Sequence, residues 1–499
     1  MSTLGTTPSP FQKPQNSNTA VLVKYPLGCS PSDIMGSVSS SSCANAFNET
    51  ILQQQSTQLD ACESILMPKP PKPPTEWKDM PAEIRLMILE RIAQAAEAHS
   101  PPNKGSLSTV CAEWRSFLER RNFESLRLES LEDVIFLDHC VSGRREGLVK
   151  TITLFVHLQA YDCRRCDRAE NDNEKKFNNF QLSRVLLRLL DVLSSWSSPR
   201  AGPKNDGVIL EIGAASTNDI QHAYTKLGGI VTDPAIRETQ HWMQSHLRRF
   251  SNEGSKKRTL GCLLDFDIDC TQRIFGKIEG LKRRATVPQA TTVTRLSIGY
   301  QYYRSLSAAG LEMLLSCLPC LTGIDYVYWC GIDREEQRLR HAADLVLLKK
   351  FPNTVTELTL QELYDIDLHI DCHPEIDGAV AAAALEASRR LSYFQGVNAF
   401  DAVHFFKDFY PGLPHRLDPP EPWLTLRFLA LTSCSTLTPD IDPLPANQLL
   451  VAAANAALQM PKLEIMELWK MWRVDGAFVF RYQVFEDSTV IEGLEAVEV

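Results

Sequence analysis

Two cysteine pairs have the spacing that redox and zinc chemistry use. Cys163 and Cys166 form one C-x-x-C motif, and Cys317 and Cys320 form a second one. Such a motif can bind zinc or cycle through a disulfide. Zinc would require two further ligands for either pair, and the pairs lie far apart in the sequence. We therefore predict a structural or incidental role for both pairs and no bound metal.

A histidine-rich stretch, LHIDCHPE, offers another set of metal ligands. His369, Asp371 and His373 would share one face if this stretch were a strand, because side chains alternate along a strand. Imidazole and carboxylate groups are suitable ligands for zinc. The polar surroundings favour a loop with solvated side chains instead.

Three aspartates alternate with apolar residues in the stretch LLDFDIDC. Asp265, Asp267 and Asp269 could form a carboxylate metal site. The same alternation is typical of a half-buried strand with a charged outer face. We favour the strand.

Signatures of known catalytic machinery are largely missing from the sequence. It contains no Gly-rich phosphate loop, no H-E-x-x-H, no G-x-S-x-G and no G-x-G-x-x-G after a strand. This favours a non-catalytic binding protein without a cofactor. The alternative is an α/β enzyme or metal-binding protein that uses the His369 or Asp265 groups.

The composition is that of a chain able to bury a large core. Of its 499 residues, 44% are hydrophobic and 23% are charged, with a net charge of −9 and a pI near 5.7. The acidic balance argues against nucleic-acid binding, which needs a concentrated basic surface. The sequence shows no secretory signal and no apolar run of membrane-spanning length. We expect a cytoplasmic or nuclear protein, no membrane partner, and mostly free cysteines.

The domain boundaries follow from local composition. Residues 1–66 are rich in Ser, Thr, Asn and Gln and lack an apolar period, which predicts a disordered tail. Residues 67–76 are rich in proline and predict an extended linker. A helical region is expected over 77–125, and a larger α/β region over 126–499.

The first predicted helix, WKDMPAEIRLMILERI (77–92), has apolar residues on two sides. Its start is marked by Pro81, which fits the first turn of a helix. Ile84, Met87 and Ile88 lie on one arc, whereas Leu86, Leu89 and Ala93 lie on roughly the opposite one. A second helix is expected over 106–121. Some 45 residues are too few to cover both arcs, so a permanent partner is predicted.

Residues 77–120 resemble an F-box, the helical motif that docks on a Skp1-like adaptor in cullin-based ubiquitin ligases. Met80-Pro81 stands where Leu-Pro is usual. The other matching elements are Glu83-Ile84, Ile88-Leu89 and the segment from Val110-Cys111 to Trp114-Arg115.

The rest of the chain resembles a large, mostly uncharacterised group of filamentous-fungal F-box proteins with a leucine-rich carboxy-terminal region. YDCRRC at 161–166 and MPKLEIMELW at 460–469 carry this likeness. The resemblance implies a substrate receptor that binds the adaptor, the cullin scaffold indirectly, and an unidentified target protein. An F-box protein that acts outside ubiquitin ligases is an alternative. The adaptor-facing residues would be Met80, Pro81, Ile84, Ile88, Val110 and Trp114.

Strands and helices are expected to alternate after the F-box. Predicted strands cover 126–130, 149–158, 207–214, 294–300, 323–329, 355–363, 425–433 and 463–471. Predicted helices cover 180–193, 308–318, 335–351 and 447–458.

This alternation predicts an irregular leucine-rich-repeat-like α/β horseshoe, whose units stack and share one core. A doubly wound α/β domain is the alternative, and residues 215–290 fit neither pattern well. Four tryptophans at strand ends could be packing residues or anchors for a bound protein: Trp329, Trp423, Trp469 and Trp472.

Overall fold

We analysed a computed structural model of the chain. It describes residues 19–23, 76–98, 107–161, 165, 168–196, 207–216, 218–219, 273–274, 276–281, 287–299, 304–331, 333–364, 377–412, 421–437, 443–472 and 476–484. The chain divides into two compact units. The smaller unit is Gly28–Asn122, and the larger one consists of Phe123–Val499 together with Met1–Leu27.

The smaller unit is helical where it is described. Trp77–Asp79 form a 3₁₀ turn, η2, and the helices are α2 (Ala82–Ala98) and α4 (Ala112–Glu124), whose last residues pass into the larger unit. The predicted helix 77–92 is therefore interrupted. Proline disfavours a helical conformation in the residue before it, and Met80 is extended (φ −76°, ψ 142°). The carbonyl of Pro81 then accepts the first hydrogen bonds of α2.

The larger unit is mixed α/β and contains a large, mostly parallel sheet. The order of its strands is β1-β13-β12-β11-β10-β9-β8-β6-β4-β3-β2, and β5 and β7 form a separate two-stranded sheet. The strands are β1 (Thr19–Val23), β2 (Ser125–Leu128), β3 (Thr151–His157), β4 (Val208–Ala215), β5 (Lys277–Ile278), β6 (Val293–Ile298), β7 (Ser305–Leu306), β8 (Gly323–Trp329), β9 (Glu357–Leu363), β10 (Tyr393–Val397), β11 (Phe428–Thr432), β12 (Ile465–Trp472) and β13 (Gly476–Gln483).

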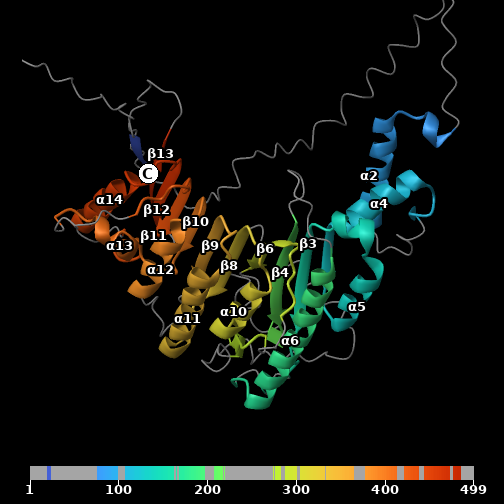
Figure 1. The fold of residues 1–499 in the computed structure, drawn as a ribbon, viewed down its shortest axis with the longest axis horizontal. Helices are drawn as coiled ribbons and strands as arrows, with labels where there is room; N and C mark the ends of the chain where they lie inside the picture. Colours follow the sequence, from blue (N-terminus) through green and yellow to red (C-terminus); the bar gives the residue numbers. More distant parts are fainter. Residues whose placement is uncertain are drawn as a thin grey trace, which may run out of the picture. The chain divides into compact units, whose positions relative to one another are not determined.

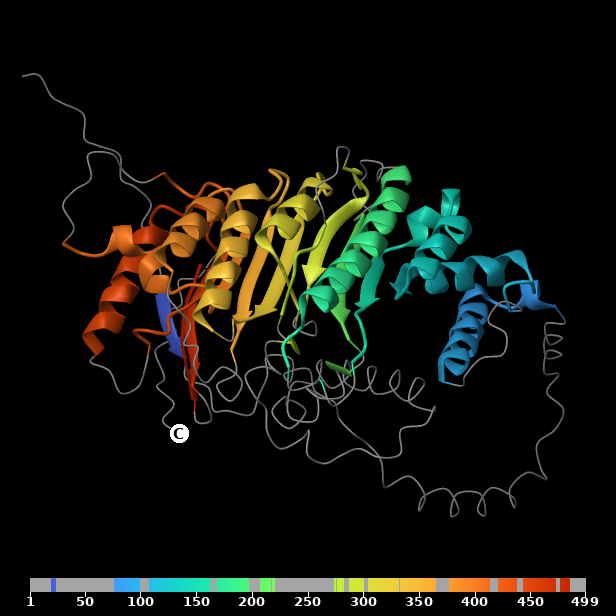
Figure 2. The same cartoon turned by 90° about the horizontal axis from the view of Figure 1, so that it is seen from below.

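The parallel strands from β2 to β12 are added in one direction, and all eight strands predicted from the sequence are among them. Parallel crossovers are almost always right-handed, so strands added in one direction place their helices on one face of the sheet. Figures 1 and 2 show this arrangement in the larger unit. From β2 to β13 the strands of this sheet follow one another without a reversal of order, unlike those of a doubly wound sheet, and β1 adds to the edge at β13.

Six helices of the larger unit begin at side chains that accept hydrogen bonds from free backbone N–H groups. Ser130 and Asn171 form full capping boxes with Asp133 and Glu174, respectively. The helices are α5 (Leu131–Cys140), α6 (Asp172–Ser195), α10 (Ala308–Ser316), α11 (Arg334–Lys350), α12 (Gly378–Ser388), α13 (Ala402–Phe405) and α14 (Pro443–Ala457), with 3₁₀ turns η3 (Gly143–Leu148) and η5 (Lys407–Phe409). The four predicted helices correspond to α6, α10, α11 and α14.

One continuous apolar core runs beneath the helices, from Leu128 on β2 to Phe480 on β13. Strand residues alternate between this core and the opposite face. On β9, for example, Leu358 and Leu360 are buried, whereas Thr359 and Gln361 are half-buried. Trp423 is fully buried and donates a hydrogen bond to Ser388, so it is a packing residue.

Within the predicted tail over 1–66, the structure describes Thr19–Val23. This segment forms β1, which pairs antiparallel with β13. Its sequence, TAVLV, is short and apolar and can add to a sheet edge, although the composition around it is polar. Among the described residues, no helix is long and apolar enough to cross a bilayer.

Candidate functional site

The smaller unit has large apolar side chains in contact with solvent. Met87 is 60% exposed, Ile84 is 44% exposed, and Val110, which precedes α4, is 59% exposed. Leu86 is also exposed. Exposed apolar side chains concentrated in a short segment are typical of interaction sites.

The opposite side of α2 is covered. Leu89 and Ala93 are buried, as is Leu118 on α4. The helix therefore has a buried side and an apolar exposed side. Leu86 was expected on the same arc as Leu89 and Ala93, but it is exposed, so the buried side is narrower than that arc. Only the exposed side is available to a partner.

A polar clamp positions the segment before α2 against α4. The carboxylate of Glu113 accepts a hydrogen bond from the indole nitrogen of Trp77 (2.7 Å) and another from Nε of Arg85 (3.0 Å). These two bonds lower the pKa of Glu113. Arg85 also donates to the carbonyl of Met80 (2.7 Å), and the rings of Trp77 and Trp114 lie 5.5 Å apart. The clamp thereby holds the Met80–Pro81 turn beside α4.

The six residues predicted to face the adaptor differ in exposure. Pro81, Ile84 and Val110 are exposed, whereas Met80, Ile88 and Trp114 are half-buried. Each retains some contact with solvent. The sequence reasoning missed Met87, the most exposed of the large apolar residues of α2, together with the clamp residues Trp77, Arg85 and Glu113. The position of Met87 on the same arc as Ile84 was the available signal for it.

In the larger unit, the face of the sheet opposite the helices carries no described helix (Figure 2). Its strand register aligns mostly polar residues into a row that runs from β2 to β13. The row consists of Arg127, Thr153, Glu211, Ser297, Asp325, Thr359, Gln395, Ala430, Glu467 and Arg481.

Charge pairs and aromatic pairs order this face. Arg295 donates two hydrogen bonds to Asp325 (2.7 and 3.0 Å) and one to Glu357 (2.7 Å), which joins β6, β8 and β9. On β10 and β11, the rings of Tyr393 and Phe428 stack 4.5 Å apart. These half-buried groups can contact an extended partner without rearrangement of the sheet.

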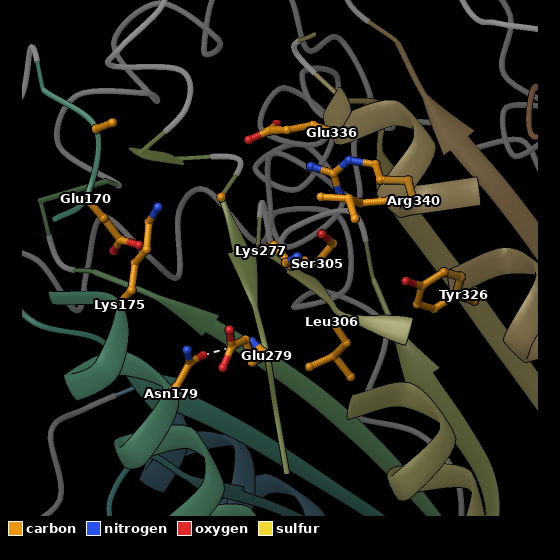
Figure 3. A pocket seen from close by; sticks show the side chains of 13 residues that line it. Glu170, Lys175, Asn179, Lys277, Glu279, Ser305, Leu306, Tyr326, Glu336 and Arg340 are labelled. Atoms are coloured by element: carbon orange, nitrogen blue, oxygen red, sulfur yellow. Dashed lines mark hydrogen bonds between the residues drawn. The ribbon is translucent and has the colours of Figure 1, made fainter. Parts of the chain in front are cut away.

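A cavity of about 280 Å³ lies near β5 and β7. Figure 3 shows Glu170 and Lys175 on one side of it, and Glu336 and Arg340 on the opposite side. Asn179 borders it and accepts a hydrogen bond from the backbone N–H of Glu279 (2.8 Å). The walls carry carboxylates and cations together, so the cavity has no single dominant charge.

Buried polar groups lie near this cavity, at the carboxyl ends of β8 and β9. Tyr328 donates a hydrogen bond to Asp344 (2.5 Å), and Gln337 donates one to Glu362 (2.8 Å). Burial raises the pKa of Glu362 to about 7 and raises that of Asp344 well above its ordinary value. Both carboxyl groups therefore hold protons more strongly than exposed acids do.

A second buried network joins the segments that follow β3 and β4. Arg304 forms ion pairs with Glu170 (2.8 Å) and Asp219 (3.5 Å), and Tyr161 donates a hydrogen bond to Asp219 (2.8 Å). Burial and the neighbouring Asp219 raise the pKa of Tyr161. Arg304 thus pairs with two carboxylates, and the network joins the segments that carry them.

The metal-ligand candidates fall mostly outside the described residues. This applies to Cys163 and Cys166, to the group of His369, and to the group of Asp265. Cys317 is a buried free thiol whose pKa burial raises to about 11, and Cys320 is also free. The described part of the chain contains no cluster of three or more His, Cys, Asp or Glu side chains that could hold a metal ion.

Residues 340–494 match a family of unknown function, DUF6546. The match begins within α11 and extends beyond β13, and it covers the carboxy-terminal part of the larger unit. No curated protein is similar enough to the chain to count as a match.

Proposed function

We propose that this chain is an F-box substrate receptor of a Skp1-cullin-type ubiquitin ligase. Its helical unit binds a Skp1-like adaptor, and its α/β unit binds a target protein. The chain itself performs no chemistry. It raises the effective concentration of the target's lysines near the charged ubiquitin-conjugating enzyme.

The exposed apolar side of α2 is the main support for this proposal. Ile84 and Met87 are exposed beside the Met80–Pro81 turn, which the Glu113 clamp holds in place. Burying a side chain of this size fully is worth roughly 1.5 to 3 kcal/mol. An adaptor that covers this side would therefore gain substantial affinity from a few residues.

The topology supports a leucine-rich-repeat-like body. Its parallel strands follow one another in sequence order, with the helices on one face. In such a horseshoe, the strand face is free to hold a partner. We place the target on this face, over the row that runs from Arg127 to Arg481.

Co-purification of the full chain with a Skp1-like adaptor tests the proposal. The variant carries Ile84→Asp and Met87→Asp, which place unpaired charges on the exposed side of α2. Because both side chains are exposed, the fold should survive while adaptor binding is lost. The matched control is Leu424→Asp, an apolar-to-charge change at an exposed residue of the larger unit.

Adaptor binding by the wild type and the control, but not by the double variant, would support the proposal. If the wild type does not bind the adaptor, or if the double variant binds it equally well, the ubiquitin-ligase proposal is wrong.

A further inference from the structure

Strand β1 covers the edge of β13, the last strand of the sheet in sequence order. Its five residues, TAVLV, pair antiparallel with β13, from Thr19 opposite Gln483 to Val23 opposite Val479. Figure 2 shows β1, in blue, at this end of the sheet. The order from β2 to β13 is complete without β1, which precedes all of these strands in the sequence but lies at the end farthest from β2. It is therefore an addition to a sheet that the other strands complete.

The edge of β13 has the sequence of a strand that pairs readily. Its eight residues, GAFVFRYQ, are rich in aromatic and β-branched side chains and include no proline. An uncovered edge presents unpaired N–H and C=O groups, and a long apolar one is a template for pairing with another chain. β1 pairs with five of the eight residues. The chain thus carries both an acceptor edge and a short occupant for it.

The two faces of β13 determine the chemistry that an occupant needs. Phe480 is buried and Tyr482 packs against the apolar core, so both lie on the core side. Arg481 lies on the opposite side, where its side chain is 46% exposed and pairs with Glu467. Directly opposite residues of an antiparallel pair share one face. In the observed register, an occupant therefore needs apolar residues opposite Phe480 and Tyr482, and it tolerates a polar residue opposite Arg481.

We propose that the edge of β13 is a binding site for an extended apolar segment of a partner protein, and that β1 is the internal competitor for this site. The resident segment has the required chemistry, since Leu22 pairs with Phe480 and Ala20 pairs with Tyr482. In strand addition of this kind, main-chain hydrogen bonds give affinity and alternate side chains give specificity. The proposal does not depend on the proposed function.

The tether sets a limit on the affinity of the site. Residues 24–122 connect β1 to Phe123, where the rest of the larger unit begins, so β1 binds the edge intramolecularly. Even a short flexible linker gives an effective concentration in the millimolar range, and a longer one gives less. β1 stays paired only if the dissociation constant of the free segment lies below this concentration. We therefore expect a peptide of this sequence to bind the uncovered edge with a dissociation constant below about 1 mM.

The first part of the test releases β1 in the full chain. Ala20→Pro with Val21→Pro removes the N–H groups of two adjacent residues, one of which points to β13 in an antiparallel pair. Asn16→Pro with Ser17→Pro makes the same change outside β1 and is the control. In hydrogen-exchange mass spectrometry, the amides of β13 that point away from β12 should exchange at least about tenfold faster in the release variant than in the wild type or the control. The amides of β8 should be unchanged.

The second part of the test adds a synthetic peptide of residues 16–26. At about 2 mM, above the expected dissociation constant, it should restore slow exchange of β13 in the release variant. The Leu22→Asp peptide should not protect β13, because it places a carboxylate beside the buried Phe480. The Val21→Asp peptide is its matched control and should protect β13, because this position lies opposite Arg481.

Competition by β1 is measured with ligand-observed NMR of the same peptide. If the dissociation constant lies below the effective concentration of β1, the wild-type edge is free for less than half of the time. The wild type should therefore bind the peptide at least about twofold more weakly than the release variant does. The proline control should bind it as the wild type does.

A release variant that does not bind the peptide would overturn the proposal, because β1 would then be an integral strand. Faster exchange of β8 in this variant would contradict it as well, since the sheet would require β1. Equal peptide binding by the wild type and the release variant would show that β1 does not compete for the edge. Equal protection by the Leu22→Asp peptide would exclude the observed register. None of these outcomes bears on adaptor binding, which the α2 variants test separately.

Discussion

The indole nitrogen of Trp77 donates a 2.7 Å hydrogen bond to the carboxylate of Glu113, which links the 3₁₀ turn before α2 to α4. The same carboxylate accepts a bond from Arg85. These two bonds lower the pKa of Glu113 and so favour its ionised form. The clamp thus fixes the Met80–Pro81 turn without requiring a large core.

We expect Glu113→Ala to weaken adaptor binding several-fold without abolishing it, because the exposed apolar side of α2 remains while its geometry loosens. Glu113→Gln should have a smaller effect, since the amide oxygen can still accept a bond from Trp77. Titration calorimetry with the purified adaptor measures both variants. Equal affinity for Glu113→Ala and the wild type would contradict a positioning role for the clamp.

The two sides of α2 should respond differently to truncation. Leu89→Ala removes a buried side chain and should lower the stability of the smaller unit by roughly 2 to 4 kcal/mol. Ile84→Ala removes an exposed one and should change it by less than about 0.5 kcal/mol. Chemical denaturation monitored by tryptophan fluorescence measures both variants. Similar destabilisation by the two would mean that both sides of α2 are internal.

The sequence was most informative where local patterns are strong. Strand β8 was predicted with both ends correct, because its alternation is regular and glycines lie at or near both ends. Strand β10 was missed because it has only five residues and includes Gly396. Helix α12 was missed because its alanines give no apolar stripe, although Val380, Ala381 and Ala384 are buried.

At the candidate site, too, the sequence predicted local features but not contacts between distant residues. Residues of one helix follow a fixed period, so the arc of Ile84 was visible in the sequence. The Glu113 clamp joins residues 28 and 36 positions apart, and no local pattern encodes such a contact. The row across the sheet likewise depends on strand register, which only the assembled sheet defines.

Arg295 should stabilise the sheet more than an exposed arginine does. Its bidentate bond to Asp325 and its bond to Glu357 join three strands. We expect Arg295→Ala to lower the stability of the larger unit by roughly 1 to 3 kcal/mol, since it leaves two carboxylates close together. Arg295→Lys keeps the positive charge but loses the planar guanidinium group that forms two hydrogen bonds to one carboxylate. We therefore expect it to lower the stability by an intermediate amount.

Arg427 provides the matched comparison, because it pairs with Glu464 at a more exposed position. Exposed pairs contribute little, so Arg427→Ala should cost no more than about 1 kcal/mol. Urea denaturation monitored by circular dichroism compares the three variants. If Arg427→Ala and Arg295→Ala lower the free energy of unfolding equally, the bonds by which Arg295 joins β6, β8 and β9 have no special role in stability.

Glu362 should make the stability of the larger unit depend on pH. Burial raises its pKa from an ordinary value of 4.5 to about 7, although Gln337 donates a hydrogen bond to it. As the pH rises from 4.5 to 7, the unfolded chain releases this proton while the folded chain keeps it. The contribution of Glu362 to the free energy of unfolding therefore falls over this interval, by up to roughly 3 kcal/mol.

Glu362→Gln removes the titration and keeps an oxygen that can accept the bond from Gln337. We expect the variant to gain roughly 2 to 3 kcal/mol relative to the wild type between pH 5 and pH 8, as measured by urea denaturation at each pH. Titrating groups that do not interact with Glu362 are common to both chains and cancel in the difference. The pKa of Asp344 should also fall in the variant, because the charge of Glu362 contributes to raising it. Glu335→Gln, at an exposed position on α11, is the control and should change the free energy of unfolding by less than about 0.5 kcal/mol. Parallel profiles for Glu362→Gln and the wild type would show that folding does not raise the pKa of Glu362.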